Sequence, residues 1–228
     1  MVSPIRVVVV EDEPLYRDLL VSALVSQIPD VVVTGSFGDA AEVRRAAAKL
    51  RGDVLLTDID LGPGDSGVAL AVDLRRRGTV RGVVLLSNLA LPTVLTSLPA
   101  DVQGGWAYLL KTSGTDVRVL GTAIAAAAEG GVMLDDRLVN ELEADASGPV
   151  ARLTPRQRDV LERMARGWSN ARIADDLSLK VRSVESVIAD ILVALDIGQP
   201  ADGVHPRVAA VLVYAQHTVA RHRGRREP

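Results

Sequence analysis

The sequence predicts a doubly wound parallel α/β sheet of five strands, followed by a small all-α domain. Over residues 1–130, short runs rich in valine and leucine alternate with stretches of helical periodicity. Such alternation is typical of strands joined by right-handed helical crossovers. After residue 150 the apolar residues recur at helical spacing instead. Of the 228 residues, 48% are hydrophobic, which is enough for the cores of two ordinary domains.

The predicted strands are apolar runs with little polar alternation, as expected for strands buried on both faces of a sheet. They are Ile5–Val10, Val31–Ser36, Val54–Thr57, Gly82–Ser87 and Ala107–Leu110. Helical patterns separate them over residues 14–24, 40–50, 68–77 and 116–129, the first opening with Pro14 and the last ending at Gly130. The crossover after Ser87 contains two prolines and a glycine pair, so we expect a short or distorted helix there.

A linker is expected over residues 131–150. Residues 131–149 carry five acidic residues and one basic residue, and the part near 135–142 has some helical character. The sequence Ser147-Gly148-Pro149 then interrupts any regular element. The predicted domains are therefore 1–130 and 151–220, with a basic tail at 221–228.

The second domain has helical patterns throughout. Thr154 and Gln157 form a capping box around Pro155, which predicts a sharply defined helix start. A short helix after Ser169 and a longer one from about Lys180 to Leu195 are joined by a tight turn, the arrangement of a helix-turn-helix. A last helix opens at Pro206.

The composition excludes several classes of protein and indicates where this one is located. The chain has no cysteine, which excludes disulfides and thiolate metal sites. It shows no signal-peptide pattern, and its apolar runs are shorter than the roughly 20 residues that cross a bilayer, so we expect a cytoplasmic protein without a membrane partner. The net charge of −3 hides a basic segment at 150–228, where 13 Lys/Arg face 9 Asp/Glu, a balance that suits an anionic partner.

Charged and hydroxyl side chains stand at the ends of four predicted strands. Glu11 and Asp12 follow the first strand, Asp58 the third, Ser87 ends the fourth and Lys111 follows the fifth. The carboxyl ends of parallel strands meet at one crevice, so these residues are expected to form one site. Carboxylates suit Mg²⁺, and a carboxylate beside such an ion can attack phosphorus while a lysine and a hydroxyl orient the phosphoryl oxygens.

Four segments around these residues resemble the motifs of bacterial response-regulator receiver domains: Val-Val-Glu-Asp-Glu-Pro-Leu (9–15), Val-Leu-Leu-Thr-Asp (54–58), Val-Val-Leu-Leu-Ser (83–87) and Tyr-Leu-Leu-Lys (108–111). Residues 152–197 resemble a LuxR-type helix-turn-helix. Together they make the chain similar to the NarL/FixJ class of two-component regulators, whose receiver is a flavodoxin-like sheet.

The resemblance implies a transcriptional regulator whose Asp58 accepts a phosphoryl group from a sensor histidine kinase. It implies Mg²⁺ bound by Glu11, Asp12, Asp58 and the carbonyl of Asp60, and a switch pair of Ser87 and Tyr108. It also implies that the active form is a homodimer on double-stranded DNA.

The longer C-terminal helix is the expected reader of DNA. Glu185 and Ser186 are predicted to contact bases in the major groove, and Ser183 and Ala189 share the outward face. The predicted phosphate contacts are Arg156, Asn170, Arg172, Lys180 and Arg182. This face is only weakly basic, so we expect one copy to bind weakly and dimerisation on two half-sites to compensate.

Two alternatives stay open beside this interpretation. The segment Thr57–Asp60, with Ser87 and Lys111, is similar to the core of haloacid-dehalogenase-type phosphatases, where Asp60 would be the general acid. The acidic pair precedes the acceptor here, which favours a switch over an enzyme. The other alternative is a regulator that acts without phosphorylation, by dimerisation or protein contacts; it is suggested by Asn88 beside the switch hydroxyl and by the broken crossover.

Overall fold

A computed structural model describes residues 3–62, 66–88, 94, 98–114, 116–144, 148–197 and 205–220. The chain separates into two units, 1–135 and 136–228, which are described separately. Among the helices in these ranges, none has both the length and the apolar character needed to cross a bilayer.

The first unit contains one parallel sheet in the order β2-β1-β3-β4-β5-β6. Its strands are β1 (Ile5–Val10), β2 (Val31–Phe37), β3 (Val54–Asp58), β4 (Gly82–Ser87), β5 (Trp106–Leu110) and β6 (Val132–Leu134). Its helices are α1 (Pro14–Gln27), α2 (Ala40–Ala46), α3 (Gly67–Arg76), the 3-10 turn η1 (Ala100–Val102), α5 (Lys111–Gly114) and α6 (Val117–Ala128). The doubly wound prediction is confirmed.

The count of five strands was wrong. The three residues of β6 pair in parallel with β5, so β5 is an inner strand and not the edge. Because β6 follows a glycine pair and is only three residues long, its run was too short to signal a strand in the sequence. The predicted linker 131–150 is thus divided between the sheet and the second unit.

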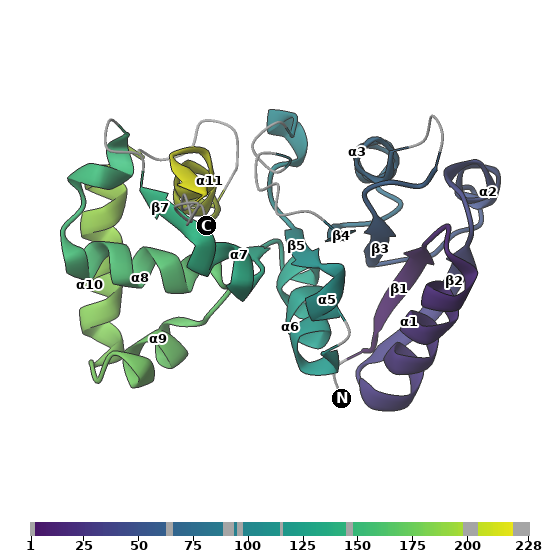
Figure 1. The fold of residues 1–228 in the computed structure, drawn as a ribbon, viewed down its shortest axis with the longest axis horizontal. Coiled ribbons are helices and arrows are strands. Elements are labelled where there is room, and N and C mark those ends of the chain that lie inside the picture. Colours follow the sequence, from purple (N-terminus) through teal and green to yellow (C-terminus); the bar gives the residue numbers. More distant parts are fainter. Residues whose placement is uncertain are drawn as a thin grey trace, which may run out of the picture. The chain divides into compact units, whose positions relative to one another are not determined.

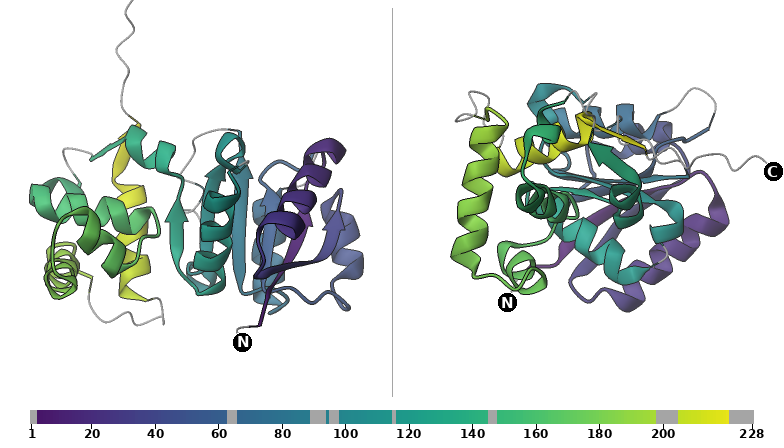
Figure 2. Two further views of the ribbon diagram at one scale, coloured as in Figure 1. Left: turned by 90° about the horizontal axis from the view of Figure 1, so that it is seen from below. Right: turned by 60° about the vertical axis from the view of Figure 1, so that its left-hand side comes forward.

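Helices cover both faces of the sheet. In Figure 1, α1 and α6 lie on one face and α2 and α3 on the other, and Figure 2 shows α1 and α6 in front of the strands when the molecule is seen from below. The four central strands are buried on both faces, as their continuous apolar runs indicate. Of the crossover after Ser87, the structure describes residues 88, 94 and 98–105, with Val94 helical and the turn η1 at Ala100–Val102; the other residues on which the expected helix falls lie outside the described ranges.

The second unit is mainly helical. Its elements are α7 (Asp136–Glu141), β7 (Leu142–Ala144), the 3-10 turn η2 (Pro149–Arg152), α8 (Pro155–Ala165), α9 (Asn170–Asp176), α10 (Val181–Ala194), α11 (Pro206–Gln216) and β8 (Thr218–Ala220). The capping box of Thr154 and Gln157 is present at the start of α8, as predicted. The segment is not purely helical, because β7 and β8 form an antiparallel pair.

The turn of the helix-turn-helix contains a residue in the left-handed region. Ser178, between α9 and α10, has φ = 53°, in the left-handed region, and the Leu179 amide donates to the carbonyl of Ala174 at 2.7 Å. This closes α9 tightly and lets α10 pack on both α8 and α9. Val184 and Ile191 of α10 are buried against them, so the opposite face of the helix is left for solvent.

Candidate functional sites

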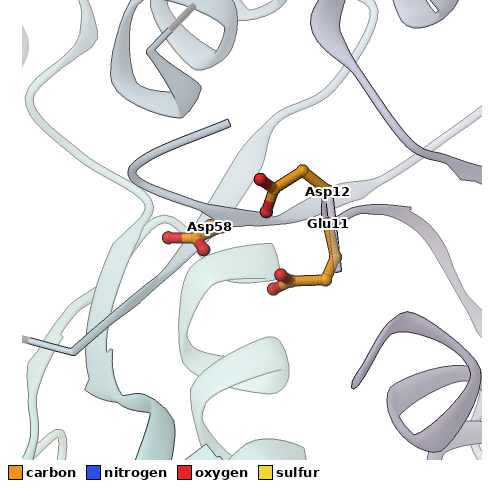
Figure 3. A group of neighbouring side chains, drawn as sticks. All are labelled: Glu11, Asp12 and Asp58. Carbon is orange, nitrogen blue, oxygen red and sulfur yellow. The ribbon is translucent and has the colours of Figure 1, made fainter. Parts of the chain in front are cut away.

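Three carboxylates meet at the carboxyl end of the sheet. Glu11 directly follows β1, Asp12 is the next residue, and Asp58 is the last residue of β3. One oxygen from each lies within 4.8 Å of the others, and Figure 3 shows the three side chains turned toward one another. Glu11 and Asp58 are buried, whereas Asp12 is exposed. The predicted convergence of these strand ends is therefore present.

Lys111 joins two of these carboxylates. Its Nζ lies 2.9 Å from Glu11 Oε1 and 2.6 Å from Asp58 Oδ2. The side chain is only 13% exposed, so the two ion pairs are shielded from water and salt. Three carboxylates and one ammonium leave a formal charge of −3 + 1 = −2 at the site.

Tyr16 fixes the lysine from its other side. Its hydroxyl donates to the carbonyl of Lys111 at 3.1 Å, and the Lys111 ammonium lies 4.9 Å from the centre of its ring. Arg17, on the same turn of α1, donates to the carbonyl of Glu11 at 2.6 Å. Both residues were missed from the sequence. For Tyr16, nothing local shows that the first turn of α1 reaches a residue 95 positions away.

Burial governs the ionisation of Glu11. It raises the pKa of this carboxyl above its ordinary value, and the Lys111 ammonium opposes the shift only in part. Burial also lowers the pKa of Lys111, but its bonds to Asp58 and Glu11 outweigh that effect, so the net shift is upward. Among the described residues, Glu11 Oε2 is the only buried side-chain polar atom without a hydrogen-bond partner. A buried, unpartnered carboxylate oxygen of this kind fits a ligand to a cation.

The other oxygen of Asp58 is held by the chain that follows it. The backbone amide of Asp60 donates to Asp58 Oδ1 at 3.0 Å, and Thr57 Oγ1 donates to the Asp58 carbonyl at 2.9 Å. Gly67, the first residue of α3, packs so closely that a Cβ there would lie 1.8 Å from the same carbonyl oxygen. Asp58 is thus clamped at both its side chain and its backbone.

Ser87 and Tyr108 come from neighbouring strands. Ser87 ends β4 and is 7% exposed, and it pairs in register with Leu110 of β5. Tyr108 is fully buried, because β6 covers the outer side of β5. Tyr108 therefore lies on an inner strand, and not on the edge strand that a sheet of only five strands would give it.

Asp135 secures this side of the sheet and was also missed. Its side chain is fully buried, its Oδ2 accepts from the Leu110 amide at 3.0 Å, and its own amide donates to the Tyr108 carbonyl at 2.8 Å. The available signal in the sequence was a carboxylate directly after the short apolar run 132–134, but this segment was assigned to a linker. It extends the β5–β6 pairing next to Lys111.

The outward face of α10 carries most of the predicted DNA contacts. Lys180, which caps the helix, and Arg182, Glu185, Ser186 and Ala189 are exposed, whereas Ser183 is half-buried. Arg156, in the first turn of α8, is also exposed. The face thus presents two cations and one carboxylate at the start of α10, which agrees with the weakly basic reader expected from the sequence.

Two of the predicted phosphate contacts have partners within their own unit. Asn170 Oδ1 accepts from Arg207 Nη1 at 2.8 Å, and Arg207 Nη2 donates to the carbonyl of Trp168. The Arg172 guanidinium lies 4.0 Å from the centre of the Trp168 ring, a cation–π contact that positions it while it remains exposed. The Nδ2 group of Asn170 is not used in this bond and is the part of the side chain that can donate to a phosphate.

Comparisons with known proteins agree with this geometry. Residues 7–119 match the family described as response regulator receiver domain, and residues 151–202 match the bacterial regulatory proteins of the luxR family. The nitrate/nitrite response regulator protein NarP of Escherichia coli K12 is 32% identical over 220 residues, covering 94% of this chain and 96% of NarP. The transcriptional regulatory protein LiaR of Bacillus subtilis is 28% identical, covering 94% and 99% of the two chains.

Solved structures give the same fold. A structure of two RcsB dimers bound to two parallel DNAs has a TM-score of 0.53 and 23% identity, covering 94% of this chain and 99% of that chain. The RcsB response regulator of Salmonella typhimurium gives a TM-score of 0.51 at 22% identity, with the same coverage. With its receiver domain, its LuxR-type helix-turn-helix and its full-length similarity to NarP, the chain belongs to the NarL/FixJ class of response regulators and is a DNA-binding transcription regulator.

Proposed function

We propose that Asp58 accepts a phosphoryl group from a sensor histidine kinase, and that this modification biases dimerisation and promoter binding. One observation carries the proposal: Asp58 ends a buried strand with Lys111 2.6 Å from one oxygen and the Asp60 amide 3.0 Å from the other. These two contacts orient the carboxylate for attack on phosphorus. They do not block it, because each oxygen keeps a further lone pair.

The proposed transfer is a displacement at phosphorus. A carboxylate oxygen of Asp58 forms the new P–O bond while the P–N bond to the kinase imidazole breaks. The electron pair of that bond goes to the ring nitrogen, and a proton from solvent keeps the leaving imidazole neutral. Lys111 and Ser87 stabilise the equatorial phosphoryl oxygens as charge builds on them. Preorganisation by Glu11 and Tyr16 keeps Lys111 in place for this role.

The acidic residues fit a hard divalent cation. Glu11, Asp12 and Asp58 would hold Mg²⁺ with the Asp60 carbonyl, and the site charge of −2 together with the unpartnered Glu11 oxygen supports this assignment. When bound, the ion supplies positive charge that offsets the phosphoryl oxygens.

Ser87 and Tyr108 are the proposed switch. Ser87 lies at the carboxyl end of β4, where its hydroxyl could approach a phosphoryl group on Asp58 of the paired strand β3. Tyr108 is fully buried. A movement of Ser87 toward the phosphoryl group would change the space available to the Tyr108 ring, and so would shift the equilibrium between two side-chain packings of β4 and β5.

The acceptor can be tested with a matched pair of aspartates. Incubation with acetyl phosphate and Mg²⁺ is expected to add one phosphoryl group to wild type and to Asp60→Asn, since Asp60 is proposed to contribute only its carbonyl. Asp58→Ala should take up none. Intact-protein mass spectrometry measures the adduct. Phosphorylation of Asp58→Ala would refute the assignment of Asp58 as the acceptor. Repeated hydrolysis of acetyl phosphate by wild type that is lost in Asp60→Asn would favour the phosphatase alternative.

The output can be tested on the protein's own promoter. Phosphorylated wild type is expected to dimerise in sedimentation and to bind more tightly than Asp58→Ala. Replacing Lys180 or Arg182 by alanine should weaken binding to every sequence and lower the salt slope by about one, whereas Glu185→Ala should change base preference. Arg118→Ala, 92% exposed on α6, is the control. Equal binding and dimerisation with and without phosphorylation would favour the phosphorylation-independent alternative.

A further inference from the structure

A cavity lies at the opposite end of the same sheet, where the strands begin. It has a volume of about 710 Å³ and is formed where the chain enters three strands: Arg6 of β1, residues 50–53 before β3 and residues 77–81 before β4. Arg44, in the last turn of α2, completes it. Glu11 comes five positions after Arg6, so about 16 Å of strand lies between this cavity and the carboxylate site.

The lining of this cavity is strongly cationic. It contains the guanidinium groups of Arg6, Arg44, Arg51, Arg77 and Arg81 and the single carboxylate of Asp53, a formal charge of +5 − 1 = +4. No aromatic side chain is among the lining residues that the structure describes. A concave surface lined by one sign of charge concentrates ions of the opposite sign.

The available carboxylates neutralise only part of this charge. Asp53 accepts from Arg6 at 3.0 and 3.2 Å and lies 3.7 Å from Arg81, so two arginines share one carboxylate. Arg77 pairs with Asp73 of α3 at 2.8 Å. With Arg44 left out of the balance, the other four guanidinium groups face Asp53 and Asp73, an excess of 4 − 2 = 2 positive charges.

Backbone contacts hold part of this set in position without reducing its charge. Arg51 Nη1 donates to the carbonyls of Ala48 at 3.4 Å and Leu50 at 3.0 Å. Arg81 remains 64% exposed and Gly78, with φ = 65°, leaves open space at the rim. The guanidinium groups therefore line an accessible cavity and are not buried in the core.

We propose that this cavity binds a small molecule that carries two or more phosphate groups. Guanidinium groups bind phosphate oxygens through paired N–H donors, and an excess of two positive charges, counted without Arg44, matches a multiply charged phosphate better than a single carboxylate. The volume is within the range of ligand sites, and the lack of aromatic rings in the lining points to recognition of the phosphates and not of a stacked base. The site is independent of phosphorylation at Asp58.

Calorimetric titration of the full chain with inorganic pyrophosphate tests the proposal. Titrations contain EDTA and constant ionic strength, so that the carboxylate site holds no metal and repels the anion. Saturable one-to-one binding is expected for wild type and, unchanged, for Asp58→Asn. ADP serves as a second probe: affinity equal to that of pyrophosphate indicates recognition of the diphosphate alone, and tighter binding indicates an organic phosphate. Both results support the site.

Neighbouring arginines of α2 supply a matched control. Arg44 lines the cavity and Arg45 does not, although both are exposed in the last helical turn. Arg44→Ala combined with Arg51→Ala should weaken pyrophosphate binding at least about tenfold, while Arg45→Ala stays within about twofold of wild type. Urea unfolding checks that all variants fold.

Three results would overturn the proposal. The first is that wild type shows no saturable binding of pyrophosphate above a chloride control. The second is that Arg45→Ala loses as much affinity for pyrophosphate as the double variant, which would indicate an effect of general surface charge. The third is that the double substitution weakens the protein's binding to double-stranded DNA while pyrophosphate binding is absent or unaffected. The last result would assign these arginines to the nucleic-acid backbone instead.

Discussion

Gly67→Ala is expected to disrupt the phosphoacceptor strand. Gly67 is the first residue of α3, and its φ lies outside the left-handed region, so helix propensity alone predicts a gain of up to about 1 kcal/mol for alanine. The surroundings predict the opposite sign. A Cβ at this position would lie 1.8 Å from the Asp58 carbonyl oxygen and 2.8 Å from Thr57 Oγ1.

The size of the effect follows from the displacement required. Cβ contacts below 3.0 Å essentially do not occur, so α3 or the end of β3 must move by at least 3.0 − 1.8 = 1.2 Å. Overpacking of this kind costs about 1–3 kcal/mol and sometimes more, and backbone is less able to yield than a side chain. We expect a net loss of about 2–3 kcal/mol in the free energy of unfolding.

The same movement should affect the chemistry. Displacement of a reacting group by about 1 Å can lower a rate about 100-fold, so phosphorylation of Asp58 by acetyl phosphate should slow by about that factor in folded Gly67→Ala. Urea unfolding and the rate of adduct formation measure the two effects. Gly121→Ala is the control: its Cβ would meet Ile28 at 3.6 Å, an ordinary contact, and alanine there should stabilise α6 by about 0.5–1 kcal/mol. If Gly67→Ala unfolds within about 0.5 kcal/mol of wild type and phosphorylates at the same rate, the packing argument is refuted.

Three further predictions concern other parts of the chain. Asp135→Ala removes the acceptor of the half-buried Leu110 amide of β5 and should lower the free energy of unfolding in urea by about 1–3 kcal/mol; a loss below about 0.3 kcal/mol would contradict its anchoring role. Arg207→Ala should lower the stability of the second unit by about 2 kcal/mol, measured by its urea midpoint, and release Asn170. The Arg6 hydrogen bond holds the pKa of Asp53 below its ordinary value of 3.8, so their pair stabilises the fold above that pH and is lost as the pH falls through the lower value of the folded state. The urea midpoints of wild type and Asp53→Asn should therefore differ at neutral pH and converge in acid; a gap that persists at acid pH would refute this linkage.

Much of the fold was predictable because its signals are local. Continuous apolar runs identify β1, β3 and β4, Pro14 and Pro155 mark the first positions of α1 and α8, and a capping box fixes the start of the latter. Strand ends of a parallel sheet converge by topology, so Glu11, Asp58 and Lys111 could be grouped from their order alone. Where the signal was weak, as in the three-residue β6, the prediction failed.

The chemical partners of these residues depend on packing between distant segments. Lys111 bridges Glu11 and Asp58, and it is also contacted by Tyr16 of α1, 95 positions away, a contact that no local pattern encodes. The pairing of Asn170 with Arg207 has the same origin, with 37 positions between them.

The sequence by itself thus determined the order of elements, the family resemblance and the identity of the strand-end residues, since periodicity, capping and motif spacing are properties of neighbouring positions. Only the tertiary structure decided that the strand of Tyr108 is covered by a sixth strand and that Asp135 holds these two strands together. It also decided that arginines from four segments surround one cavity at the amino ends of the strands. These features depend on which surfaces the sheet and helices bring together in space, and residues that are brought together only by packing leave no periodic trace along the chain.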